Sequence, residues 1–237
     1  VLKTQITISQ IISYKNLSYR RNIMSQIVKH DFVEIEYTAT IEGTSQVFDT
    51  TDEKTAKSAN IYNKGARYKP VIICIGENQI LKGLDESLIG KNSEERDYEI
   101  KLQPEDAFGK KNPKLLQLLS QSSFKKQNIT PYPGLQMNID GILGIVRTVT
   151  PGRVIVDFNH PLAGKKITYK VKVIRKVADD KEKIDSLLSF FVKEFKTEIS
   201  QGEAVVSANI PKDAQEILKE KITNLIPSIK KVTISKE

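Results

Sequence analysis

The chain has 237 residues, of which 39% are apolar and 28% are charged, with a formal net charge of +8. This composition is ordinary for a globular protein of one to three domains, and no apolar run approaches the roughly 18 residues of a membrane span. A single cysteine, Cys74, excludes an internal disulfide framework and favours the cytoplasm, while His30 and His160 are too few for a metal-ligand cluster. We therefore expect no cofactor, no metal and no membrane association.

Positive charge is concentrated in two segments. Residues 1–23 hold four basic residues and no acidic one, and residues 113–160 hold five basic residues against two acidic ones. A basic surface can contact RNA, so proximity to the ribosome is one expectation. The sequence has no basic motif interleaved with aromatics and no recognition-helix pattern, so we do not expect sequence-specific nucleic-acid binding.

The N-terminal segment and the first strands differ sharply in pattern. Residues 1–23 lack a helix cap and a sustained period, so we predict a disordered extension and a natural start at Met24. Residues 32–41 alternate between apolar and polar side chains, which predicts a half-buried strand. A short strand at 47–50 closes a hairpin, and residues 51–69 read as a polar surface excursion with a helical patch.

The middle of the chain contains a buried strand followed by a short helix. The apolar run 71–75 predicts the strand, and Ile80, Leu81, Leu84 and Leu88 recur at helical spacing. Gly90 stands where a C′ glycine ends a helix. Two further alternating segments, residues 97–102 and 166–174, predict strands of the same sheet.

The remaining segments predict two small units. Residues 113–119 read as a helical patch, and three strands at 135–139, 142–150 and 153–158 are joined by Asp-Gly and Pro-Gly turns. So small a sheet has little core, and we expect some of its apolar surface to stay exposed. Residues 178–237 predict an α+β unit of two amphipathic helices and two strands, at 204–208 and 229–235. The apolar stripe of the first helix is Ile184, Leu187, Leu188, Phe191 and Phe195. The apolar stripe of the second helix is Ala214, Ile217, Leu218, Leu225 and Ile226.

Three strings carry a resemblance to a known family. Residues 76–88, Gly-x-x-x-Ile-Leu-x-Gly-Leu-x-x-x-Leu, resemble the central segment of FKBP-type peptidyl-prolyl isomerases, and Leu84 in place of tryptophan resembles the SlyD-like branch. Ala107-Phe108-Gly109 is similar to a pocket loop of that family. Residues 159–164, Asn-His-Pro-Leu-Ala-Gly, resemble the return from an insert-in-flap domain. The α+β unit at 178–237 resembles the C-terminal domain of the long archaeal type.

The resemblance implies an α+β fold: a curved antiparallel sheet with a short central helix, a small β-rich insert and a C-terminal α+β domain. The isomerase domain would be discontinuous, comprising 27–112 and 161–177, with the insert-in-flap chaperone domain at 113–160 and the C-terminal domain at 178–237. In some long archaeal relatives the C-terminal domain is associated with dimerisation, so a homodimer through 178–237 is a further expectation.

The resemblance also implies the residues of the active pocket. They are mostly aromatic and aliphatic, and Phe108 keeps the pocket wall but lacks the hydroxyl donor of the tyrosine found in many members. The expected catalytic residues are Tyr37, Phe48, Asp49, Val71, Ile80, Leu81, Leu84, Phe108 and Tyr169. Taken singly, each is better explained as a core residue, and it is their joint order and spacing that favour the functional interpretation.

The implied function is a peptidyl-prolyl isomerase that accelerates proline-limited folding, with the insert holding unfolded or nascent proline-containing chains. Two alternatives remain. One is a holdase whose pocket is catalytically weak, because Val71 and Leu84 stand where the family often has aromatics. The other is a ribosome- or RNA-associated factor, which rests on charge alone.

Overall fold

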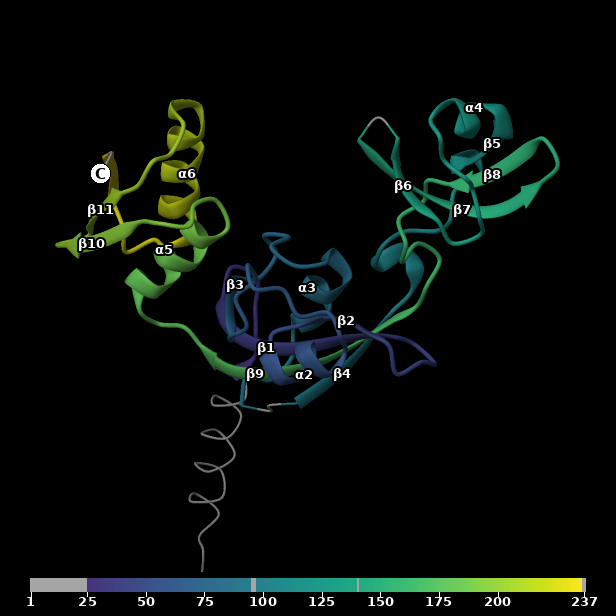
Figure 1. Ribbon diagram of the computed structural model, residues 1–237. Coiled ribbons are helices and arrows are strands. Elements are labelled where there is room, and N and C mark those ends of the chain that lie inside the picture. The colour runs from purple at the N-terminus through teal and green to yellow at the C-terminus, as the bar shows by residue number, and fades with distance from the viewer. Residues whose placement is uncertain (1–24, 95–96, 140, 236–237) are drawn as a thin grey trace, which may run out of the picture. The chain divides into compact units, whose positions relative to one another are not determined.

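The computed structural model describes residues 25–94, 97–139 and 141–235 (Figure 1). The predictions of a disordered segment 1–23 and a natural start at Met24 lie outside this part of the chain. The described residues form two compact units, one made from residues up to 102 and from 167 onward, the other from residues 103–166. No helix in the described ranges is both long and apolar enough to cross a membrane.

The first unit is built on a curved antiparallel sheet, which confirms the predicted fold class. One long strand, β1, pairs with three others, and β9 continues the sheet to β4. The strands are β1 (Phe32–Ile41), β2 (Val47–Thr50), β3 (Val71–Cys74), β4 (Asp97–Leu102) and β9 (Ile167–Lys176). A short helix, α2 (Glu53–Ser58), follows β2 and is capped by the carboxylate of Asp52.

The central helix is shorter than its apolar spacing predicts. Helix α3 spans Lys82–Leu88 with Leu81 as its N-cap, so Ile80 and Leu81 precede the helix instead of lying in its first turn. Gly90 follows the C-cap with φ +81°, which confirms the predicted glycine stop.

A buried carboxylate shapes the loop of residues 75–81, between β3 and α3. Asp85 is only 2% exposed, and its oxygens accept hydrogen bonds from the Gly76 N–H at 2.9 Å and the Asn78 N–H at 3.0 Å. Both donors have positive φ, +86° and +52°, a conformation that favours glycine or asparagine. The Gln79 amide oxygen accepts from the Cys74 N–H at 2.6 Å. The side chains of Gln79, within the loop, and Asp85, on α3, therefore hold the loop in this conformation.

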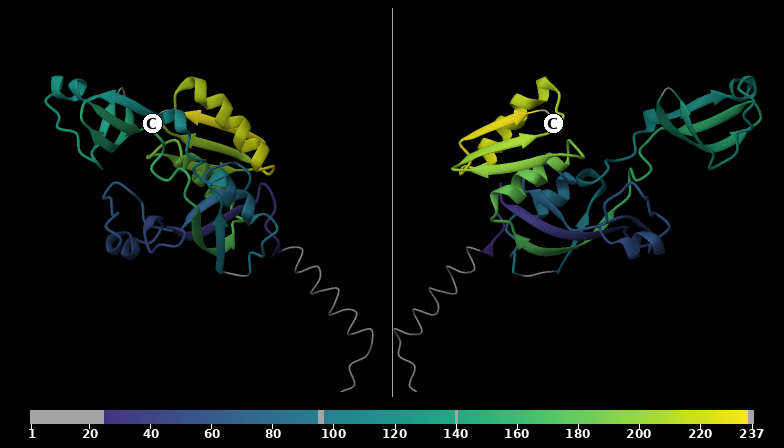
Figure 2. Two further views of the ribbon diagram at one scale, coloured as in Figure 1. Left: turned by 90° about the vertical axis from the view of Figure 1, so that its right-hand side faces the viewer. Right: turned by 60° about the vertical axis from the view of Figure 1, so that its left-hand side comes forward.

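The C-terminal segment forms a three-stranded sheet with two helices. Its elements are α5 (Asp180–Ser189), β10 (Lys196–Ser200), β11 (Glu203–Ser207), α6 (Lys212–Leu225) and β12 (Lys231–Ser235). The strands lie side by side in the order β10-β11-β12, with β11 and β12 parallel (Figure 2).

Two features of this segment differ from the prediction. Strand β10 was not expected, and Phe191 and Ile217 are 62% and 69% exposed instead of lying on buried stripes. Helix α5 ends at Ser189, so Phe191 lies beyond it. On α6 the buried residues are Leu218, Ile222 and Leu225, and Ile217 points about 100° away from that row.

The C-terminal segment shares its core with the larger sheet. Helix α5 packs on β3, and one cluster joins Phe32, Cys74 and Val177 to Ile184, Leu187 and Leu188 of α5. Cys74 is buried, as expected. The cluster also includes buried residues of α6, β11 and β12.

The second unit is a four-stranded antiparallel sheet with a short helix, not the three strands that the sequence predicted. The order is β5-β8-β7-β6, where the strands are β5 (Leu116–Ser120), β6 (Gln136–Ile139), β7 (Ile142–Thr150) and β8 (Arg153–Asp157). The predicted helix at 113–119 is wrong: a single 3₁₀ turn, η2 (Pro113–Leu115), leads into β5, and the helix α4 (Gln121–Lys126) comes after it. A second 3₁₀ turn, η1 (Pro104–Asp106), opens the unit.

Pairing with β8 explains the error. Leu119 lies opposite Val154 and packs against a core whose fully buried residues are Phe124, Val146, Val154 and Val156. Leu118 lies opposite Ile155 on the other face and is exposed. Successive leucines of this run therefore point to opposite faces of a strand. The apolar pattern of so short a run did not distinguish such a strand from a helix.

We expect Asp85→Asn to lower the free energy of unfolding by about 1–3 kcal/mol, because the amide supplies one acceptor oxygen where the carboxylate supplies two. Chemical denaturation measures the loss, and hydrogen exchange should be faster at Gly76 and Asn78. Asp97→Asn, on the exposed start of β4, is the control and should stay within about 0.5 kcal/mol. Unchanged exchange at both amides would contradict this role of Asp85.

Candidate active site

Three aromatic rings meet where β1, β2 and β9 lie side by side. Tyr37 and Tyr169 pack edge to face with ring centroids 5.7 Å apart. Phe48 packs on Tyr169 in the same way, with ring centroids 6.4 Å apart and an angle of 85° between the ring planes. Tyr169 lies opposite Ala39 in the β1–β9 register, where a small side chain leaves room beside the ring. The three rings make an apolar wall of the kind that binds an apolar ligand group.

A bulge in β2 brings two of the predicted residues into this cluster. Asp49 lies opposite Ala39 and Val47 lies opposite Thr40, so the register shifts by one residue at Phe48. Such bulges re-aim side chains next to functional sites. Here consecutive residues both reach the site: Phe48 packs on Tyr169, and Asp49 accepts a hydrogen bond from the Tyr37 hydroxyl at 3.0 Å.

The Tyr37–Asp49 pair is the polar part of the cluster. Burial raises the pKa of the Tyr37 hydroxyl well above its ordinary value, and the nearby Asp49 charge raises it further. The same two causes raise the pKa of Tyr169. Both tyrosines therefore stay neutral, and Tyr37 remains a hydrogen-bond donor across the physiological range.

The loop before α3 presents two further predicted residues. Ile80 and Leu81 are half-buried, whereas Leu84 is buried in the manner of a core residue. Among the described residues, none accepts a hydrogen bond from the Leu81 N–H at the N-cap of α3. An unsatisfied N–H at a helix start can bind a carbonyl oxygen of a ligand.

The remaining predicted residues are Val71 and Phe108. Val71 pairs with Ile35, which places it on the same face of the sheet as Tyr37. Phe108 belongs to the 103–166 unit, where its ring stacks on His160 with centroids 4.6 Å apart. His160 in turn accepts a hydrogen bond from the Leu162 N–H. A position of Phe108 over the pocket stays a prediction.

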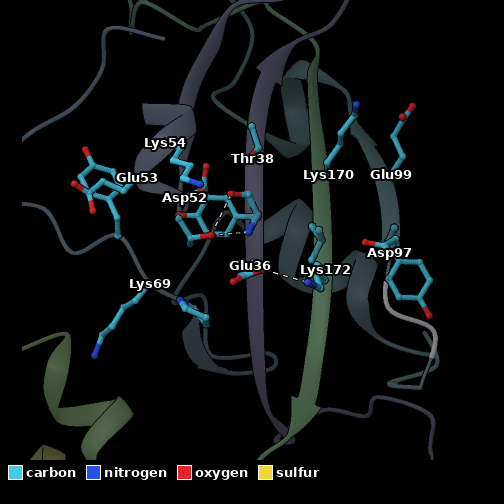
Figure 3. Close-up of a pocket in the computed structure, with 16 residues that line it drawn as sticks. Glu36, Thr38, Asp52, Glu53, Lys54, Lys69, Asp97, Glu99, Lys170 and Lys172 are labelled. Atoms are coloured by element: carbon cyan, nitrogen blue, oxygen red, sulfur yellow. Dashed lines mark hydrogen bonds and ion pairs between the residues drawn. The ribbon is translucent and has the colours of Figure 1, made fainter. Parts of the chain in front are cut away.

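The opposite face of the sheet carries a hollow that the sequence analysis did not identify. It has a volume of about 820 Å³ and lies over β1, β9 and β4, with Glu36, Thr38, Lys170 and Lys172 among its lining residues (Figure 3). Alternation along β1 puts Glu36 and Thr38 on the face away from Tyr37. The labelled side chains are mostly charged, and the Nζ of Lys172 lies 3.7 Å from Oε2 of Glu36. Tyr68, Pro70 and Tyr98 also line the hollow, so it combines charged side chains with some apolar surface, unlike the three packed rings of the aromatic cluster.

The described part of the chain contains no group of three or more side chains suited to a metal ion. What the aromatic cluster offers is an apolar surface, one donor–acceptor pair and one backbone N–H. These groups can hold an extended peptide and exclude water from part of it, but they supply no activated nucleophile.

Comparison with known proteins adds independent support. The family model described as FKBP-type peptidyl-prolyl cis-trans isomerase matches residues 24–123, and the model described as FKBP26, IF domain, matches residues 117–162. A short-type peptidyl-prolyl cis-trans isomerase of Methanocaldococcus jannaschii is 30% identical over 151 residues, which cover 64% of this chain and 94% of that protein.

Two bacterial relatives are also FKBP-type peptidyl-prolyl isomerases. An FKBP-type 16 kDa peptidyl-prolyl cis-trans isomerase of Escherichia coli is 29% identical, covering 52% of this chain and 81% of that protein. The SlyD FKBP-type peptidyl-prolyl cis-trans isomerase of Helicobacter pylori is 28% identical, covering 62% of this chain and 74% of that protein. With the predicted sheet, the aromatic cluster and these matches in agreement, the chain belongs to the FKBP-type peptidyl-prolyl cis–trans isomerases and carries an insert-in-flap domain.

Proposed function

We propose that this isomerase accelerates proline-limited folding of unfolded or nascent chains, with catalysis at the aromatic cluster and client binding by the 103–166 unit. The observation that carries the proposal is the packing of Tyr37, Phe48 and Tyr169 around a single polar pair, Tyr37–Asp49.

The chemistry of the reaction suits such a surface. Rotation about a peptide bond breaks amide resonance and has a barrier of about 18–20 kcal/mol. Before proline the two isomers differ by about 0.5–1 kcal/mol, so only the barrier has to be lowered. The twisted amide has lost charge separation and needs less solvation than the planar one. A water-poor, apolar pocket therefore favours the transition state over the ground state without a nucleophile or acid–base pair.

Each polar group then has a role in holding the substrate. In our proposal the Leu81 N–H binds a substrate carbonyl and fixes the register of the peptide, as the family resemblance implies. The Tyr37 hydroxyl and Asp49 lie beside the rings and orient the amide that rotates. Val71, Ile80, Leu84 and Phe108 complete the proposed walls.

Client binding is supported by apolar side chains on the surface of the 103–166 unit. Its fully buried core is small, and several large apolar side chains are exposed: Leu115, Leu116, Leu118, Tyr132, Ile142, Leu143 and Ile155. Exposed apolar surface of this kind marks a site for another chain. A client held there keeps its prolines at high effective concentration near the pocket.

Three further expectations belong to this proposal. The open face of β10, β11 and β12, with Val205 exposed, offers a surface for a homodimer through 178–237. A single cysteine, buried at position 74, suits the cytoplasm. The basic excess in residues 113–160 supports proximity to the ribosome.

Phe48→Ala should lower kcat/KM for a proline-containing tetrapeptide by about tenfold or more, because it removes an apolar wall worth about 1.5–3 kcal/mol. Tyr37→Phe keeps its ring but loses the bond to Asp49 and should cost about threefold. A protease-coupled or NMR exchange assay measures both. Tyr62→Ala, which alters an exposed ring outside the cluster, should leave the rate unchanged. Full activity of Phe48→Ala would place catalysis elsewhere.

Leu118→Ser combined with Ile142→Ser should leave tetrapeptide isomerisation unchanged but slow the catalysed refolding of a long, proline-limited client. Both side chains are more than half exposed, so the loss comes from client binding and not from the core. Ile217→Ser, an equally exposed change on α6, is the matched control. Equal refolding rates for the double variant and the wild type would contradict client binding by this unit.

The same assays discriminate the alternatives. Suppressed aggregation without accelerated tetrapeptide exchange would favour a holdase. Steeply salt-dependent RNA binding would favour a ribosome-associated factor.

A further inference from the structure

The loop of residues 75–81 is contacted from the C-terminal segment as well as by Asp85. Lys221 on α6 lies with its Nζ 2.8 Å from Oε2 of Glu77, in the middle of the loop. The other Glu77 oxygen lies 3.7 Å from His30. Both members of the Lys221–Glu77 pair are largely shielded from solvent, with side chains 28% and 21% exposed. Solvent therefore screens this pair less than it screens the exposed pairs elsewhere on the surface.

The strand that enters the loop is held by the same segment. Strand β3 pairs with β1, and no second strand pairs with it in the described sheet. Ile72 and Cys74 pack into the cluster formed with Ile184, Leu187 and Leu188 of α5. The C-terminal segment thus contacts β3 through its apolar side chains and the next turn of chain through Lys221.

The loop has a reason to need this support. Gly76 and Asn78 both have positive φ, and the chain must leave this turn with Ile80 and the Leu81 N–H in position. A displacement of about 1 Å in a substrate-positioning group can cost two orders of magnitude in rate. Asp85 on α3 bonds to the backbone of the loop, and Lys221 on α6 pairs with the side chain of Glu77.

We propose that the C-terminal segment, residues 178–235, is a positioning element of the isomerase, and that Lys221 acts through Glu77 to hold the loop that presents Leu81 to the substrate. Lys221 is thus a positioning residue, since it acts through the loop and not on the reacting amide. This inference rests on the proposed placement of the substrate site at the aromatic cluster and the Leu81 N–H.

The test uses the full-length chain and a proline-containing tetrapeptide, which is too short to need the client-binding unit. Lys221→Gln and Glu77→Gln should each lower kcat/KM by about threefold to tenfold. The double variant should lose no more than either single variant, because all three lack the same contact. The exchanged pair, Glu77→Lys with Lys221→Glu, should recover most of the activity.

Lys219→Gln is the matched control. Lys219 stands on the same helix and pairs with Glu216 at 2.6 Å, within α6 and away from the loop. This variant should keep wild-type activity. All rates are measured well below the unfolding midpoint of each variant, and the amide resonance of Leu81 should shift in Lys221→Gln but not in Lys219→Gln.

Wild-type kcat/KM in Lys221→Gln would overturn the inference, as would an equal loss in Lys219→Gln or additive losses in the double variant. Full activity in Phe48→Ala would instead refute the placement of the substrate site. The two failures are therefore distinguishable.

Discussion

The two-sided alternation of β1 is the constraint on which the first unit depends. Successive side chains of a strand point to opposite faces, and β1 exchanges backbone hydrogen bonds with β2, β3 and β9. On one face it presents Tyr37 to the aromatic cluster. On the other it presents Phe32 to the C-terminal segment and Glu36 to a charged hollow. A shift of one residue in its register would exchange these faces and abolish the site.

The proposed active site contains few polar groups, which suits a reaction that requires little polar chemistry. The half-buried Tyr37 hydroxyl donates a hydrogen bond to Asp49, whose carboxylate is exposed to solvent at the edge of the cluster. Asp85, the other carboxylate close to the site, is occupied by two backbone N–H groups of the loop. The proposed donor to the substrate is thus a backbone N–H, whose position depends on the loop and its supports.

The 103–166 unit shows a different balance. Four fully buried residues make a core that cannot cover both faces of a four-stranded sheet. Its exposed leucines and isoleucines therefore follow from its size, and in the proposed function they are the surface that holds clients. Its core is nevertheless tight at one point, since a Cβ built on Gly144 would lie 2.7 Å from a methyl carbon of Val156.

The sequence by itself determined the strands of the larger sheet and the glycine that ends α3. These follow from local periodicity and turn chemistry, which act over a few residues. The aromatic residues of the cluster were expected from the family resemblance and not from any local pattern. The run of leucines at 115–119 was misread because a strand partner 30 or more positions away decides between helix and strand. The start of α3 at Lys82 was decided by Asp85, whose bonds to Gly76 and Asn78 hold the preceding turn out of the helix.

Only the tertiary structure showed that Lys221 pairs with Glu77, because no local sequence pattern relates two residues so far apart in the chain. It also showed that the C-terminal segment shares a core with β3, which a sequence pattern of alternating helices and strands cannot reveal. Local propensity selects the elements of this protein. Long-range packing decides which of them meet, and the support of the proposed substrate-binding loop depends on those contacts.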